Sequence, residues 1–156
     1  MMNKTGTQPL VEEPGVYVLA ASLSAPRAAR RALVGVRELA RDGELLFIGQ
    51  LLTGELVSNV LRHSNLRPGE EFLLAIECDE HTLTVEVTDA GVGFNALMLL
   101  REYALADAHH RGLALINALA DRWGFRSGPG CCVWFELDLV PGRRPWRGRE
   151  PIPPNV

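Results

Sequence analysis

The chain has 156 residues, a length that suits one domain, and its formal net charge of −3 argues against a basic surface of the kind that binds nucleic acid directly. Charged residues make up 22% of the chain, and no apolar run approaches the roughly 18 residues of a membrane span. Because the first residues also lack the apolar core of a signal peptide, we expect a cytoplasmic protein that does not contact membranes.

Composition divides the chain into three parts. Residues 1–14 are predicted to be a flexible leader, residues 15–140 a folded domain, and residues 141–156 a disordered tail in which proline, glycine and arginine prevent packing. The 3 cysteines form no Cys-x-x-Cys pair and leave an odd thiol over. The sequence therefore supports neither a zinc site nor a disulfide framework.

The first half of the predicted domain holds one strand and two helices. Residues 15–21 are rich in β-branched and aromatic side chains, which favour a strand. The serine, alanine and proline at 24–26 are typical of a helix start, and the apolar spacing extends this helix to about residue 41. A second helix is predicted from residue 44 to residue 63 or 64.

The second half is dominated by strands. Two apolar segments with a short polar stretch between them predict a β-hairpin, and the alternation in the second segment indicates one buried face. A weakly helical segment, a short apolar helix and two further strands follow. Three consecutive apolar residues favour a central, two-sided position for the last strand. The predicted segments are residues 71–77, 82–88, 95–108, 112–120, 122–125 and 131–139.

A polar stripe is predicted on the second helix. Glu55, Asn59 and His63 recur every four residues and therefore share one side of a helix, while leucines and valines cover the other side. A carboxylate can accept a proton, and a carboxamide oxygen one turn away is a neutral ligand of the kind that Mg²⁺ takes beside phosphate oxygens. A solvated helix face explains the same pattern when this stretch is considered alone.

A second chemical signal lies where the hairpin ends. Asp89 is followed by Gly91 and Gly93, and a carboxylate here can accept a hydrogen bond from the exocyclic amine of adenine while the glycines let the base approach the backbone. A plain tight turn is the alternative for this motif alone. The dinucleotide fingerprint and the Gly-rich loop with Lys-Ser/Thr are both missing. His109 and His110 lack a third ligand at a suitable spacing, so no metal site is expected there.

Taken together, three motifs resemble, in order and approximate spacing, the nucleotide-binding boxes of the ATPase superfamily that includes DNA gyrase, histidine kinases and mismatch-repair ATPases. Within that superfamily, the short length, the arginine-rich start of the first helix and the Val-Trp-Phe-Glu-Leu run at 133–137 resemble the anti-sigma-factor serine/threonine kinases. The resemblance covers about residues 15–140. The three motifs are Glu55-x-x-x-Asn59, Asp89-x-Gly91-x-Gly93 and Arg111-Gly112-Leu113-x-Leu115-Ile116.

The resemblance implies a Bergerat-type fold, which is an α/β two-layer sandwich. Helices cover one face of a mixed, mostly antiparallel sheet, and ATP lies between the helices and a lid at residues 95–110. The resemblance also implies that Glu55 is the general base, that Asn59 is the ligand of Mg²⁺, and that Asp89 reads adenine. The other implied nucleotide-binding residues are His63, Gly91, Gly93, Arg111, Gly112, Leu113 and Cys132.

The activity implied by the resemblance is that of an ATP-dependent serine/threonine protein kinase. Such a protein binds a sigma factor, phosphorylates a small antagonist protein and thereby regulates transcription; relatives also lead us to expect a homodimer. Two departures leave an alternative open, because His110 stands where relatives commonly have glycine and Cys132 where most have threonine beside the adenine. A regulatory ATP-binding module with little or no phosphotransfer fits both departures. A histidine-kinase fragment and a stand-alone ATP hydrolase fit less well, since no phosphoacceptor hairpin or coupled domain is expected.

Overall fold

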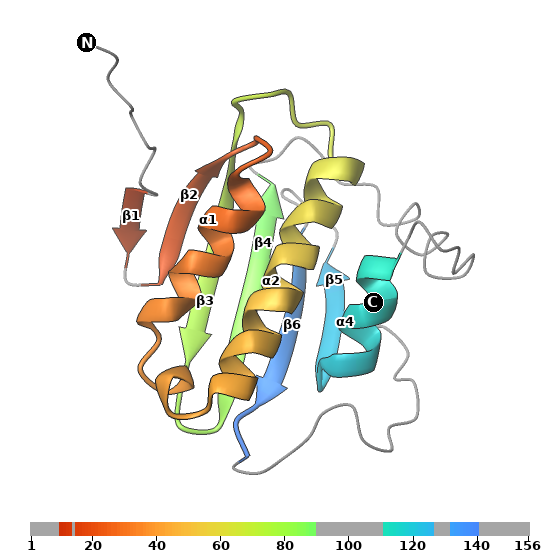
Figure 1. Cartoon of the computed structure of the whole chain (residues 1–156). Helices are drawn as coiled ribbons and strands as arrows, with labels where there is room; N and C mark the ends of the chain where they lie inside the picture. Colours follow the sequence, from red (N-terminus) through yellow and green to blue (C-terminus); the bar gives the residue numbers. More distant parts are fainter. Residues whose placement is uncertain (1–9, 14, 90–110, 127–131, 141–156) are drawn as a thin grey trace.

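The computed structural model describes residues 10–13, 15–89, 111–126 and 132–140, and these residues form two layers. Figure 1 shows a single sheet with all the described helices on one of its faces. The predicted two-layer α/β sandwich is therefore confirmed. The helices are α1 (Ala25–Ala32), α2 (Gly43–His63) and α4 (Arg111–Leu119).

The described part of the sheet has six strands in the order β1-β2-β3-β4-β6-β5, and each neighbouring pair is antiparallel. A mixed, mostly antiparallel sheet was expected, and the described strands contain no parallel pair. The predicted hairpin is confirmed as β3 and β4, and the last strand, β6, lies inside the sheet. The strands are β1 (Leu10–Glu13), β2 (Val16–Ala20), β3 (Glu71–Cys78), β4 (Thr82–Asp89), β5 (Arg122–Arg126) and β6 (Cys132–Asp138).

Strand β1 corrects the predicted leader. Its residues fall in the segment for which the sequence predicts flexibility, but they pair with β2 at the edge of the sheet, with Leu10 opposite Val18. Gly15 leads into β2 with a φ of +87°, a conformation that other residues rarely adopt. A Cβ at Gly15 would also clash with the carbonyl oxygen of Ile76. The folded part of the chain therefore includes residues 10–13.

The first predicted helix is shorter than expected. After α1 the chain forms two 3₁₀ turns, η1 (Leu33–Gly35) and η2 (Leu39–Arg41), and it is extended at Val36 between them. In an unbroken helix, Leu33 and Leu39 would point about 120° apart. In the structure both reach Gly49 of α2, since a Cβ there would lie 3.6 Å from Leu33 Cδ1 and 3.9 Å from Leu39 Cδ1. The break thus allows both leucines to enter the core.

The longest helix, α2, has nearly the predicted bounds. Asp42 caps its start, because Oδ1 accepts hydrogen bonds from the backbone amides of Glu44 at 3.0 Å and Leu45 at 3.2 Å. By length and composition α2 could cross a membrane, with a mean hydropathy of 1.2, but 56% of this apolar window is buried inside the domain. Its apolar residues pack on the sheet and on α1, and this packing accounts for its composition.

The two faces of the sheet differ. The open face, away from the helices, carries ion pairs of Arg126 with Glu86 and of Arg122 with Glu136 and Asp138. Trp134 is half-buried on this open face, so β6 is central in the sheet but not buried on both sides. The covered face packs against the helices through the alternating buried residues Phe72, Leu74, Ile76, Leu83, Val85, Val87, Val133, Phe135 and Leu137.

A buried hydrogen bond joins α4 to β5. Trp123 is 2% exposed, and its indole Nε1 donates to Oδ1 of the buried Asn117 at 3.0 Å. Replacing Trp123 with phenylalanine leaves that oxygen without its indole donor, so we expect the free energy of unfolding to fall by about 1–2 kcal/mol. Urea-induced unfolding followed by circular dichroism measures this loss.

Trp134 provides the matched control for this prediction. Because it is half-buried on the open face, Trp134→Phe should change the free energy of unfolding by no more than about 0.5 kcal/mol. Similar losses in the two variants would contradict a specific contribution of the bond between Trp123 and Asn117.

Candidate functional site

The predicted polar stripe lies in the second half of α2. Glu55 and His63 are half-buried, and Asn59 is 2% exposed. The other side of the helix is apolar and fully packed, with Leu56, Val57 and Val60 in the core. The packed side fixes the rotation of α2, and the rotation fixes the direction in which the polar stripe points.

A residue that the sequence analysis missed contacts this stripe. The guanidinium of Arg62 donates from Nη2 to Oδ1 of Asn59 at 2.8 Å, and its Nε lies 3.4 Å from the carbonyl oxygen of Ser58. Arg62 is itself exposed. The spacing of three residues, which brings two side chains together on a helix, is the signal in the sequence that could have indicated this pair.

Asp89 lies at the end of β4, as predicted. It is 1% exposed and stands opposite Phe72 of β3, on the face of the sheet that the helices cover. A carboxylate at such a position is buried beneath the helix layer, and it is therefore placed to accept hydrogen bonds from donors with little competition from water.

Asp89 and the polar stripe of α2 lie at similar distances along the long direction of the domain. Figure 1 shows α2 and β4 running in the same direction, and near their starts a Cβ at Gly49 would lie 3.3 Å from Leu83 Cδ2. From that contact, Asp89 is about 20 Å further along β4. Asn59 and His63 are about 15 Å and about 21 Å further along α2. The last turns of α2 are thus level with the end of β4.

Helix α4 brings a helix N-terminus toward the same end. It begins at Arg111, one residue before the predicted start, and Figure 1 shows its first turn directed to the end of the molecule where α2 and β4 finish. The first amides of a helix lack partners within it, and with the helix dipole they favour anions. Arg111 and Gly112 are the first two residues. The side chain of Leu113 is buried in the core, so only its backbone amide can face a ligand.

Cys132 points away from the face of the sheet that carries Asp89. In β4 and β6 the covered face takes the odd-numbered residues, which include Asp89 and Val133. Cys132 stands opposite Thr88 on the open face, where its Sγ accepts a hydrogen bond from Arg126 at 3.5 Å and burial raises the pKa of its thiol. Because strand side chains alternate between faces, Cys132 and Asp89 point to opposite faces of the sheet, which argues against a place for Cys132 beside an adenine bound at Asp89.

Some predicted positions lie outside the described residues: Gly91, Gly93 and the lid at residues 95–110, with its two histidines. Within residues 10–13, 15–89, 111–126 and 132–140, no cluster of three or more His, Cys, Asp or Glu could hold a metal ion. A metal ion at Asn59 would therefore need ligands from phosphate oxygens and water, as Mg²⁺ commonly takes them.

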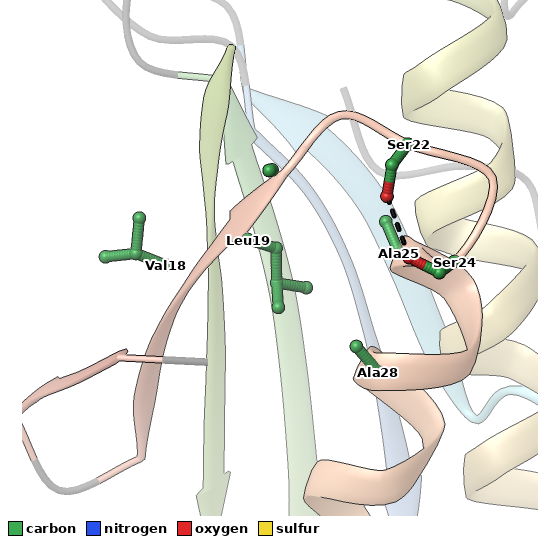
Figure 2. Close-up of a pocket in the computed structure, with 7 residues that line it drawn as sticks. Val18, Leu19, Ser22, Ser24, Ala25 and Ala28 are labelled. Carbon is green, nitrogen blue, oxygen red and sulfur yellow. Dashed lines mark hydrogen bonds between the residues drawn. The ribbon is translucent and has the colours of Figure 1, made fainter. Parts of the chain in front are cut away.

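A small cavity lies elsewhere in the domain, between β2 and the start of α1 (Figure 2). Its volume is about 50 Å³, whereas pockets for nucleotide-sized ligands reach about 300–1,000 Å³. Ser22 and Ser24 face one another at its rim, with their hydroxyl oxygens 3.0 Å apart. None of the predicted site residues lines it, and the lining residues are Val18, Leu19, Ala20, Ser22, Ser24, Ala25 and Ala28.

Comparison with known families agrees with this arrangement. The family model of the histidine kinase-like ATPase domain matches residues 19–137. That range contains the second half of α2, the end of β4 and the start of α4, which are the elements that carry the predicted site residues. A comparison with curated proteins finds no match. Because the family model covers well over half of the sequence, the chain belongs to the histidine kinase-like ATPase domain family.

Proposed function

We propose that this protein binds ATP with Mg²⁺ and transfers the γ-phosphate to a serine or threonine of a partner protein. The observation that carries the proposal is that the last turns of α2 are level with the end of β4, while the first turn of α4 is directed toward the same end of the domain. The buried carboxylate of Asp89 and the polar stripe of α2 therefore lie toward the same end of the domain. The start of α4, which is suited to bind an anion, is directed toward that end. Membership of the ATPase family supports the nucleotide as the ligand.

The described residues are chemically suited to bind both the adenine base and the phosphates with their Mg²⁺. The carboxylate of Asp89 can accept a hydrogen bond from the exocyclic amine of adenine. Asn59 offers a neutral oxygen of the kind that hard cations prefer, and its Nδ2 is buried without a hydrogen-bond partner among the described residues. Mg²⁺ held there would offset the negative charge on the phosphate oxygens. Glu55, one turn before Asn59, is the acid closest to that position along the stripe.

In the proposed reaction, Glu55 acts as the general base. Its carboxylate accepts the proton of the acceptor hydroxyl as the hydroxyl oxygen forms a bond to the γ-phosphorus. The bond from the γ-phosphorus to the bridging oxygen breaks, and ADP leaves with the electron pair. The amides at the start of α4, among them those of Gly112 and Leu113, stabilise the negative charge of the phosphates.

The partners follow from the resemblance and remain proposals. They are a sigma factor, bound without phosphorylation, and a small antagonist protein that accepts the phosphate; a cytoplasmic location and a homodimer belong to the same expectation. The alternative of a regulatory module without phosphotransfer rested on two departures from the family pattern. One of them, Cys132, lies on the open face of the sheet, opposite to the face on which Asp89 would meet the adenine. This observation favours the kinase over the module.

Labelled ATP, Mg²⁺ and candidate antagonist proteins encoded near the gene provide the test. Transfer of label to a serine or threonine of one candidate, dependent on Glu55, supports the kinase. Binding of ATP without transfer to any candidate favours the module instead. A wild-type protein that binds no adenine nucleotide in calorimetry would refute both.

A further inference from the structure

We propose that Arg62 competes with Mg²⁺ for the side-chain oxygen of Asn59, so that the metal is admitted only when this arginine moves away. The inference rests on the proposed function, because it takes Asn59 as the metal ligand. The inference makes Arg62 the residue that determines how strongly Mg²⁺ tightens nucleotide binding. Arg62 acts through Asn59 and is therefore a positioning residue.

The first argument is the hydrogen bond itself. Nη2 of Arg62 lies 2.8 Å from Oδ1 of Asn59, which is the atom that Mg²⁺ would need. The amide nitrogen of Asn59 cannot replace it as a ligand, because it carries hydrogens and donates. The bond also fixes the orientation of the carboxamide, since a flipped amide would bring an N–H group against the guanidinium.

The second argument is charge. Mg²⁺ binds oxygen ligands at about 2.1 Å, so a metal on this oxygen would lie within a few ångströms of a guanidinium that is always protonated. Two cations so close repel each other, even near a protein surface. One of them must leave. Arg62 is exposed, and its other hydrogen bond among the described residues is the long one of 3.4 Å from Nε to the carbonyl oxygen of Ser58. Arg62 is therefore the group that moves.

The experiment measures how much Mg²⁺ tightens nucleotide binding. A non-hydrolysable ATP analogue is titrated into the protein by calorimetry, once with EDTA and once with saturating Mg²⁺. The dissociation constant with EDTA is divided by the dissociation constant with Mg²⁺, and this ratio is compared between variants. We expect this ratio to be about 3- to 10-fold larger in Arg62→Gln than in the wild type, because the metal no longer displaces a charged hydrogen bond. Arg62→Lys, which keeps the charge but loses the planar fork, should lie between them.

Two controls separate this effect from others. Arg67→Gln removes a nearby exposed charge outside α2, and it should leave the ratio within twofold of the wild type. In an Asn59→Ala background, Arg62→Gln should no longer change the ratio, since the two residues act as a pair. A change that persists in this background would mean that Arg62 acts on the phosphates directly, and it would overturn the competition.

The outcomes also distinguish this inference from the proposed function. If the wild type binds no nucleotide, the proposed function fails. If the wild type binds the analogue and Mg²⁺ tightens it, but Arg62→Gln leaves the ratio unchanged or smaller, the competition alone is refuted. Circular dichroism of each variant confirms that α2 remains folded, which is expected because glutamine and arginine have similar helix propensities.

Discussion

Replacing Glu55 with glutamine is expected to reduce phosphotransfer to the acceptor protein by about 10²- to 10⁴-fold, which corresponds to roughly 3–5 kcal/mol of activation free energy. The amide keeps the size of the side chain but cannot take a proton from the attacking hydroxyl. ATP affinity should stay close to that of the wild type, because Glu55 is assigned to the proton and not to the adenine or the metal. Single-turnover transfer of labelled phosphate measures the rate, and calorimetry measures the affinity.

Glu77→Gln is the matched control for this variant. Glu77 is an exposed residue of β3 with its side chain on the open face of the sheet, so the same chemical change there should leave the rate within twofold of the wild type. Equal losses in the two variants would point to a general effect of charge. A Glu55→Gln protein with the wild-type rate would show that another group takes the proton.

Periodicity made the central elements predictable from the sequence. The strand β4 follows from strict alternation, and the apolar side of α2 from its helical spacing, because burial on one side leaves a regular signal in both cases. Glu55, Asn59 and Asp89 could therefore be placed on named elements before any geometry was known. The family match over residues 19–137 includes the positions of all three motifs.

Features that depend on tertiary packing could not be predicted in the same way. The break after α1 arises because Leu33 and Leu39 must both meet Gly49, which is a contact with another helix. The face of Cys132 depends on the register between β4 and β6, and a shift of one residue would have reversed it. β1 is a short edge strand that carries too little pattern to be recognised against its polar surroundings.

The Asn59–Arg62 hydrogen bond shows a different limit of sequence analysis. The three-residue spacing permits the contact, but many arginines at such spacing point into solvent and contribute little. Only the structure shows that Oδ1 of Asn59 already has a donor. A motif therefore indicates which residue is chemically suited to a metal, while the structure shows which group already binds its oxygen.

Replacing Asp89 with asparagine is expected to weaken ATP binding by about 5- to 150-fold, the equivalent of about 1–3 kcal/mol, while Glu55→Gln leaves it nearly unchanged. If the amide nitrogen of asparagine faces the adenine amine, two donors oppose each other in a site that is only 1% exposed.

Inosine triphosphate sharpens the test, because it has an acceptor oxygen where ATP has the amine. The wild type should prefer ATP, and Asp89→Asn should narrow or reverse that preference, since its amide can donate to the oxygen. Calorimetric titrations with both nucleotides, and thermal unfolding to confirm the fold, measure this difference. An unchanged ratio between ATP and inosine triphosphate would show that Asp89 does not read the base.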